Sequence, residues 1–248
     1  MNLTRFLILR LEGPLMSFGG VAVDQHGITL PFPTLSMVTG LLSNALGYGH
    51  GDTNLLERLQ QRIRFGARRD RKGEHIIDYQ TVDLGQDFLR GSWTTHDQPA
   101  SRGGDKGNRE GTHIRYRHYW ADAIFTLAMT LEPADEPPDL DRLSVSLKEP
   151  ERPLFLGRKS CLPSGPILTE EIDAPSIHEA LTLARLSPRA DQGALLASWP
   201  VDNAPQPDNQ QGREIAVSDR RDWANQIHVG RRFVWEAPIS PHEVDHGL

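Results

Sequence analysis

The chain has 248 residues, of which 38% are hydrophobic and 24% are charged, a composition typical of a globular protein with a sizeable core. No apolar run approaches the roughly 20 residues of a membrane helix, which argues against a membrane protein. Cys161 is the only cysteine, which excludes an internal disulfide and a cysteine-based zinc site. These features predict a cytoplasmic protein.

The net charge of −6 is unevenly distributed along the sequence. Residues 62–118 contain 12 Lys and Arg against 8 Asp and Glu, a balance of +4, whereas the remainder carries −10. Phosphate binding depends on the local field, so a basic region can bind nucleic acid within an acidic protein. The alternative is an ordinary solvated face, because charge runs often have no partner.

The first elements are predicted to be a strand and two helices. Residues 6–11 form a short apolar run broken by Arg10, which favours a buried strand over a signal peptide. Thr34 or Ser36 can cap a helix with an apolar face at helical spacing, and a second helix is expected after it. Gly40 inside the first helix costs about 1 kcal/mol relative to Ala, which suggests a close contact there.

The middle of the chain is predicted to be rich in strands. Strands are expected over residues 64–69, over residues 75–84, and along a β-type run over residues 113–131. Residues 97–112 hold four glycines and few apolar side chains, so no core can form there. We expect a flexible loop or the tip of an extended hairpin in this segment.

Shorter elements complete the pattern. The prediction is a helix over residues 140–147, a strand over residues 153–157, a helix that Ser176 and Glu179 cap, a loop over residues 199–212 and a strand over residues 227–235. The order of the first 157 residues suits an α+β, ferredoxin-like (RRM-like) sheet with helices on one face. RNA-recognition modules of this architecture expose the other face to bases.

One constellation combines cations with aromatic side chains. In a strand, Arg115, Arg117 and Tyr119 would share one face. Tyr116 and His118 would share the opposite face. Single-stranded RNA needs aromatic planes for its bases and charge for its phosphates, so this pattern indicates RNA binding. The alternative is a half-buried strand with exposed arginines.

The sequence offers little for catalysis. His50 and Asp52 lack a third ligand at a familiar spacing, so no metal site is expected. His118 with Lys106 could act as base and cation in a metal-independent ribonuclease, although a contact of His118 with RNA or another subunit is the favoured interpretation. Nothing resembles a phosphate-binding loop, a nucleophile elbow or a dinucleotide fingerprint.

Five blocks in order resemble the CasD family, within the wider Cas-five group of CRISPR-associated proteins. They cover a first strand with a glycine turn, a first helix, two strand motifs and a glycine–basic–cysteine motif, at residues 9–19, 32–42, 78–82, 117–125 and 156–161. Beyond residue 170 the similarity is thinner. The resemblance implies a ferredoxin-like RNA-binding domain over residues 1–168. It also implies a β-hairpin thumb over residues 92–112 and a smaller β-containing region over residues 169–248 packed on the domain.

The same resemblance implies a non-catalytic RNA-binding subunit of a type I-E CRISPR surveillance (Cascade) complex. Such a subunit grips the repeat-derived 5′ handle of the crRNA and caps the backbone filament in antiviral defence. The expected partners are crRNA, the Cascade backbone subunit, the large PAM-reading subunit and, through the complex, target DNA. Neither a cofactor nor a metal is expected. The alternative from another class is a metal-independent endoribonuclease that processes precursor crRNA.

The residues expected to contact RNA come from the first glycine turn, the thumb, the strand after it and the late basic motif. They are Ser17, Phe18, Arg102, Lys106, Arg109, Arg115, Tyr116, Arg117, His118, Arg158 and Lys159.

Overall fold

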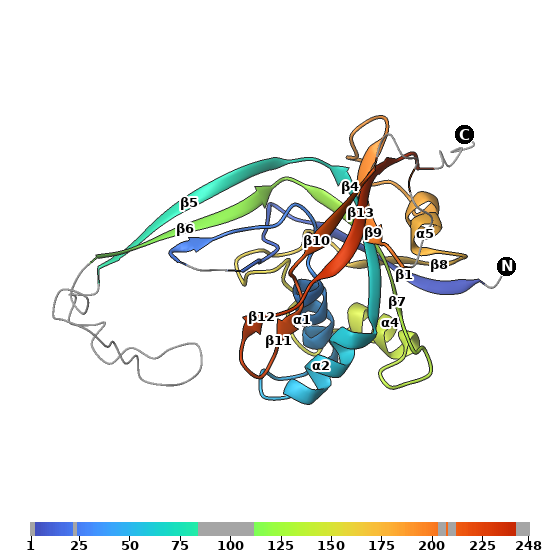
Figure 1. Ribbon diagram of the computed structural model, residues 1–248, viewed down its shortest axis with the longest axis horizontal. Helices are drawn as coiled ribbons and strands as arrows, with labels where there is room; N and C mark the ends of the chain where they lie inside the picture. Colours follow the sequence, from blue (N-terminus) through green and yellow to red (C-terminus); the bar gives the residue numbers. More distant parts are fainter. Residues whose placement is uncertain (1–2, 22–23, 84–111, 203–206, 208–211, 242–248) are drawn as a thin grey trace.

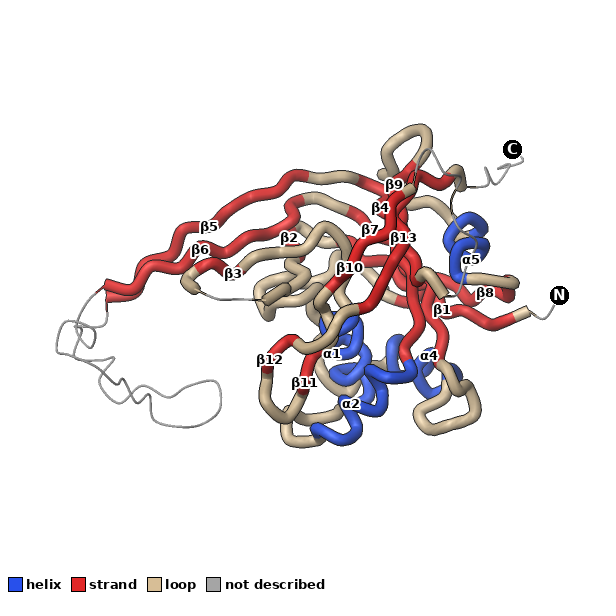
Figure 2. The backbone as a smooth tube through the Cα atoms, in the orientation of Figure 1, coloured by secondary structure: helices blue, strands red, loops and turns tan. Residues whose placement is uncertain are grey.

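The structure is a computed structural model that describes residues 3–21, 24–83, 112–202, 207 and 212–241. Figures 1 and 2 show a central sheet with helices beside it and a long two-stranded ribbon that reaches away from the body of the protein. Most of the thumb predicted over residues 92–112 lies outside the described residues.

The central sheet has seven strands in the order β10-β13-β9-β4-β7-β1-β8, and all its neighbours pair antiparallel. Its strands are β1 (Thr4–Glu12), β4 (Ile63–Arg71), β7 (Ile124–Leu131), β8 (Leu168–Ala174), β9 (Leu195–Pro200), β10 (Arg213–Val217) and β13 (Arg232–Ile239). Strands from both sides of residue 168 share this sheet, and the division of the chain there stays a prediction.

A second sheet contains β2 (Leu15–Met16), β3 (His26–Gly27), β5 (Glu74–Asp83) and β6 (Thr112–Ala121), with β6 paired to all three others. A small hairpin consists of β11 (Arg221–Asp222) and β12 (Ile227–His228). The run predicted over residues 113–131 is divided between the two sheets, because Asp122 has a left-handed backbone with φ 53° that turns the chain.

The helices cover both faces of the central sheet. They are α1 (Leu35–Leu46), α2 (Thr53–Arg62), α4 (Leu140–Lys148) and α5 (Ile177–Leu183). Helices α1, α2 and α4 share one apolar core with Leu7 and Leu9 of β1, whereas α5 packs on the opposite face against Phe6 and Ile8. The three helices within the first 157 residues share one face, and α5, from the later part of the chain, covers the other, since apolar side chains of β1 alternate toward both faces. None of the described helices has the length and apolarity needed to cross a bilayer.

Local signals in the sequence set the helix ends. The Thr34 hydroxyl accepts a 3.2 Å hydrogen bond from the N–H of Met37, so Thr34 and not Ser36 caps α1. Gly47 ends the helix with φ 82°, a left-handed conformation that favours glycine. Ser176 caps α5 in the same manner as Thr34 caps α1, with a 3.1 Å hydrogen bond from Glu179.

Other predictions need correction near the end of the chain. Residues 153–157 form a loop and not a strand, although Leu156 remains tied to Cys161 by a 2.7 Å main-chain hydrogen bond. The single strand predicted over residues 227–235 is two strands, because β12 ends at His228 and β13 begins only at Arg232. The loop predicted over residues 199–212 begins two residues later than expected, because β9 continues to Pro200.

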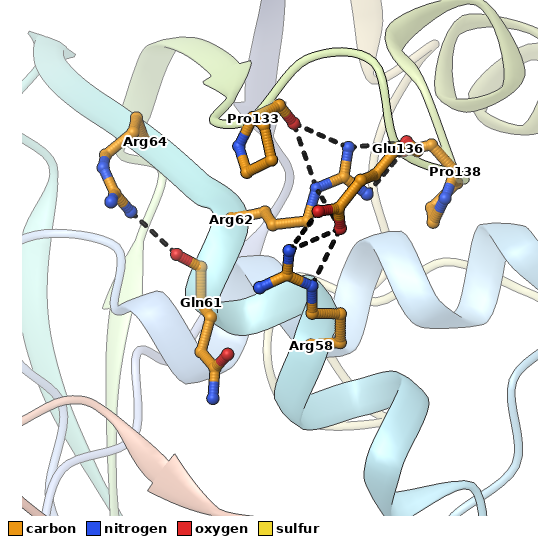
Figure 3. Close-up of polar contacts among 7 residues, drawn as sticks. All are labelled: Arg58, Gln61, Arg62, Arg64, Pro133, Glu136 and Pro138. Carbon is orange, nitrogen blue, oxygen red and sulfur yellow. Dashed lines mark hydrogen bonds and ion pairs between the residues drawn. The ribbon is translucent and has the colours of Figure 1, made fainter.

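Some of the cations in the basic segment, residues 62–118, are buried inside the protein. Figure 3 shows Arg62, whose side chain has no exposed surface and donates to the main-chain oxygens of Pro133 (2.8 Å), Glu136 (2.6 Å) and Pro138 (3.0 Å). The carboxylate of Glu136 accepts a 2.9 Å hydrogen bond from Arg58. The pKa of Arg62 is lowered, mainly because the side chain is buried. This arginine holds the loop between β7 and α4, and no ligand can reach it.

A second arginine of the segment is buried beneath α5. Arg68 and Asp70 have no exposed side-chain surface and pair at 2.6 Å between Nε and Oδ1. Asp70 also accepts a 2.8 Å hydrogen bond from the hydroxyl of Thr126. Nearby, Arg71 pairs with Asp122 at 2.7 Å. The count of cations over residues 62–118 therefore overstates the positive surface that RNA could reach.

Candidate RNA interface

The β5–β6 ribbon carries most of the predicted site residues that the structure describes. The two strands pair antiparallel along their whole length, and Tyr79 lies opposite Tyr116. Asp78 lies opposite Arg117 in the same register. On the other side of β6, β3 pairs parallel and places His26 opposite Tyr116. Directly opposed residues share a face of a sheet, so the ribbon has one aromatic face and one polar face.

The aromatic face is a row of contacting rings from three strands. The rings of Tyr116 and His26 are stacked with centroids 4.6 Å apart and an angle of 9° between their planes. Tyr79 continues the row at 5.4 Å from Tyr116 and is 55% exposed. His118 and His75 extend it toward the body of the protein, with 3.2 Å between Nδ1 and Nε2. Exposed ring faces of this kind are surfaces on which nucleobases stack.

The polar face presents the two arginines predicted to bind phosphate. Arg115 is exposed, and Arg117 donates a 3.3 Å hydrogen bond to the side-chain oxygen of Gln80. Tyr119, expected to share their face, is only 5% exposed because it belongs to the main apolar core. The cation–aromatic pattern therefore divides between a free outer part of β6 and an inner part that packs.

His118 is poorly placed to act as a base on RNA. Burial lowers its pKa, and the neighbouring His75 and His26 lower it further, so the ring is neutral at pH 7. Its Nε2 atom is buried and has no hydrogen-bond partner among the described residues. Nδ1 faces His75. Neither ring nitrogen is therefore open to a 2′-hydroxyl in this arrangement.

Ser17 and Phe18 are packing residues, which corrects their predicted contact with RNA. Phe18 has no exposed surface and meets Phe125 edge-on with ring centroids 5.1 Å apart. Ser17 is 2% exposed, and its hydroxyl donates a 3.1 Å hydrogen bond to the main-chain oxygen of His118. A buried ring cannot stack on a base, so the two residues position β6 against the core.

Arg158 and Lys159 are adjacent in sequence and differ in their surroundings. The Arg158 guanidinium donates to the main-chain oxygens of His118 (3.0 Å) and Gly27 (2.6 Å). It also lies 4.8 Å from the centre of the Tyr119 ring. Lys159 is exposed. Arg158 thus joins β3 to β6 and supports the ribbon, whereas Lys159 is available to a ligand.

The three thumb cations lie outside the described residues. Arg102, Lys106 and Arg109 therefore stay predictions, as does the pairing of Lys106 with His118. Within the residues that the structure describes, no group of three or more His, Cys, Asp or Glu side chains is arranged to hold a metal ion.

Comparison with known proteins adds to this geometry. The family model described as "CRISPR-associated protein (Cas_Cas5)" matches residues 6–235. The chain belongs to the Cas5 family of CRISPR-associated proteins. The Cas5 match extends well past residue 170, where the resemblance seen in the sequence becomes thin, and includes the strands β9 and β10 and the first half of β13.

One characterised relative and two solved structures are similar to the chain. The chain is 30% identical to the "CRISPR system Cascade subunit CasD" of Escherichia coli (strain K12) over 177 residues, which cover 71% of this chain and 75% of that protein. A solved "CRISPR RNA-guided surveillance complex" contains a chain with a TM-score of 0.67 at 22% identity, covering 95% of this chain and 90% of that chain. A "Cas protein" crystal structure gives a TM-score of 0.59 at 26% identity, with 96% and 98% covered.

Proposed function

We propose that this Cas5 protein is a non-catalytic, RNA-binding subunit of a type I-E CRISPR surveillance complex. It grips the repeat-derived 5′ handle of the crRNA and caps the backbone filament. The observation that carries the proposal is the β5–β6 ribbon, with Tyr79 and Tyr116 on one face and Arg115 and Arg117 on the other. The 30% identity to a Cascade subunit CasD supports the same assignment. Its partners would be crRNA, the backbone subunit, the large PAM-reading subunit and, through them, target DNA.

The order of the elements supports a ferredoxin-like assignment for the first part of the chain. With α2 and the strands of the second sheet set aside, the succession β1, α1, β4, β7, α4, β8 reads β-α-β-β-α-β, and these strands are neighbours in the order β4-β7-β1-β8. In this proposal the ribbon is the stem of the thumb and the protein works in the cytoplasm. The opposite sheet face is under α5, so the ribbon and not that face would meet the bases.

The test is direct binding of a labelled handle RNA to the purified chain. The variant Arg115→Ala/Tyr116→Ala/Arg117→Ala removes two cations and one ring from the outer part of β6. Its affinity should fall, and the slope of log affinity against log salt should decrease by about 0.7 for each lost phosphate contact. The matched control Arg142→Ala/Arg185→Ala removes two exposed cations outside the ribbon and should bind like the wild type.

Unchanged affinity and salt slope in the ribbon variant would reject the proposal. The endoribonuclease alternative is tested separately, by incubating the isolated protein with precursor repeat RNA in EDTA. Cleavage that disappears in His118→Ala would replace the binding proposal with that enzyme. We expect the RNA to remain intact, because His118 does not present a free ring nitrogen.

A further inference from the structure

A hollow of about 370 Å³ lies between the last strands of the central sheet and the segment that follows β3. Its lining includes Phe65 and Ala67 of β4 and Val234 of β13. Residues 28 and 30–33 line it from the opposite side, and β10 closes one end. We call this space the β10 hollow. Most of its lining side chains are apolar, so it suits an apolar group.

The two charged side chains that line the β10 hollow already have partners. Arg232 pairs with Asp219 at 2.7 Å and lies 4.8 Å from the centre of the Phe65 ring. Glu236 accepts a 2.5 Å hydrogen bond from Arg213. An ion therefore finds no unpaired countercharge in the hollow. A neutral apolar group, by contrast, would displace water and leave both ion pairs intact.

Strand β10 has an unpaired edge at this hollow (Figure 2). It is the outermost strand of the central sheet, and among the described strands only β13 pairs with it. Ile215, Ala216 and Val217 all line the hollow. Successive side chains of a strand point to opposite faces, so three consecutive lining residues mean that the hollow reaches the main chain at the edge. The free N–H and C=O groups of β10 are thus available to a further strand.

The other edge of the central sheet differs from β10 in its charge. Edge strand β8 carries Glu170, Glu171 and Asp173 within seven residues. Charged side chains on an edge strand discourage pairing with another chain. The last three residues of β10 are all apolar and carry no such protection. The sheet is therefore open to a further strand at its β10 edge.

The wall opposite β10 is fixed by contacts within the chain. The N–H of Leu30 donates a 2.7 Å hydrogen bond to the main-chain oxygen of Phe18. The oxygen of Leu30 accepts a 2.8 Å hydrogen bond from the indole of Trp120. Phe32 meets Phe125 edge-on with ring centroids 5.9 Å apart. A preformed site loses little conformational entropy on binding, so even a short segment can bind there.

The polar groups around the hollow fit a polypeptide with a carboxylate. The hydroxyls of Ser198 and Ser218 line the hollow and make no hydrogen bond with the described residues. Arg231 is exposed and forms no ion pair with a described residue. Because Val217 lies opposite Arg232, Arg231 stands near the end of β10. A carboxylate on an incoming segment would complement this cation.

We infer that β10 pairs with an extended segment of another protein, which adds one more strand to the central sheet. An apolar side chain of this segment fills the β10 hollow, and a carboxylate beside it pairs with Arg231. In this mode of recognition main-chain hydrogen bonds give affinity and a pocket for alternate side chains gives specificity. The inference does not depend on the proposed function, because no residue of the β5–β6 ribbon lines the hollow.

The probe is a synthetic seven-residue peptide of alternating threonine and valine with a glutamate at each end, titrated into the full chain. Two further versions carry N-methyl groups on alternate amides, one on the odd and one on the even positions. Alternate N–H groups of a strand point to the same edge, so only one version should lose affinity, by about tenfold or more. Absence of binding, or an equal effect of both methylation patterns, would overturn strand addition.

Variants of β10 test the site on the protein. Val217→Glu places a carboxylate in the hollow and should weaken peptide binding about tenfold or more. Ala216→Glu is the matched control, because its side chain is exposed on the opposite face of the strand, and should bind like the wild type. Arg231→Ala should lower the affinity and its salt dependence. Equal binding by Val217→Glu and Ala216→Glu would place the peptide elsewhere, and the methylated peptides test the inference even if Val217→Glu does not fold.

Other occupants of the edge would give different results. A free chain that sediments as a dimer, and as a monomer when it carries Val217→Glu, would assign the edge to a second copy and overturn the inference. Removal of residues 242–248 that raises the affinity for the peptide severalfold would assign it to the chain's own end. The ribbon variant Arg115→Ala/Tyr116→Ala/Arg117→Ala should bind the peptide normally. Failure of the RNA proposal and failure of this inference are therefore distinguishable.

Discussion

Arg158 donates a 3.0 Å hydrogen bond to the main-chain oxygen of His118, which ties the late basic motif to the base of the ribbon. A second hydrogen bond of 2.6 Å reaches Gly27 on β3. The cation that the sequence assigned to RNA therefore holds two strands of the interface together. Its neighbour Lys159 is exposed and does not join the two strands.

These two adjacent cations should respond differently to alanine. Arg158→Ala should lower the free energy of unfolding by about 1–3 kcal/mol, because it removes charge-assisted hydrogen bonds to partly buried oxygens. Lys159→Ala should leave stability unchanged within about 0.5 kcal/mol and weaken RNA binding. Urea unfolding and RNA titration of both variants would check this, and equal stability of the two would contradict it.

Phe18→Ala should behave as a core mutation. The ring has no exposed surface and packs on Phe125, so its loss should destabilise the fold by about 3–5 kcal/mol. Phe18→Leu conserves more volume and should cost less. RNA affinity, measured at a temperature where each variant remains folded, should be close to that of the wild type. A large loss of affinity in a folded Phe18→Leu protein would restore the direct contact with RNA.

Asp70 should be among the most sensitive charged positions. Asp70→Ala leaves the guanidinium of Arg68 buried and without its carboxylate, which should lower the free energy of unfolding by about 3–5 kcal/mol. Glu132→Ala provides a matched comparison, because the Arg64–Glu132 pair is exposed to solvent and should contribute about 0–1 kcal/mol. Chemical denaturation would measure both, and similar losses would show that burial of the first pair is unimportant.

Tyr79 offers the sharpest test of base stacking on the ribbon. Tyr79→Ala should weaken single-stranded RNA binding by about 1–3 kcal/mol, whereas Tyr79→Phe keeps the ring and should bind nearly as well. Ile77 lies on the same face and is equally exposed at 55%, but it has no ring. Ile77→Ala should consequently change affinity little. If Ile77→Ala and Tyr79→Ala were equivalent, general apolar contact and not stacking would explain binding.

Stability should fall as the pH falls below the ordinary histidine pKa of 6.5. Burial lowers the pKa of His178, and burial together with Arg221 lowers that of His228. The unfolded chain then binds more protons than the folded chain between each lowered pKa and 6.5, so acid favours unfolding in that window. Melting temperatures measured between pH 7 and pH 5 should decline, and His178→Phe should decline less steeply. If the melting temperature of His178→Phe fell with pH as steeply as that of the wild type, other groups would be responsible for the effect.

The sequence by itself determined those elements whose ends and faces depend only on residues close to them in the chain. Thr34 and Gly47 set the ends of α1 because a hydroxyl cap and a left-handed glycine act within a few residues of themselves. The alternation along β6 placed Tyr116 and His118 on one face, since strand geometry alone decides this. Family motifs in order led to the Cas5 assignment, which the match over residues 6–235 confirms.

Only the tertiary structure decided which of these side chains a ligand can reach. Phe18 was predicted to contact RNA, and Arg62 and Arg68 were counted in the basic segment, but contacts with distant segments bury all three. Trp223, which has no family motif around it in the sequence, is likewise buried and lies beside α1 at a hollow that it lines together with Met37, 186 positions earlier in the chain. Exposure and charge at a site depend on which distant segments meet there, and no local pattern carries that information.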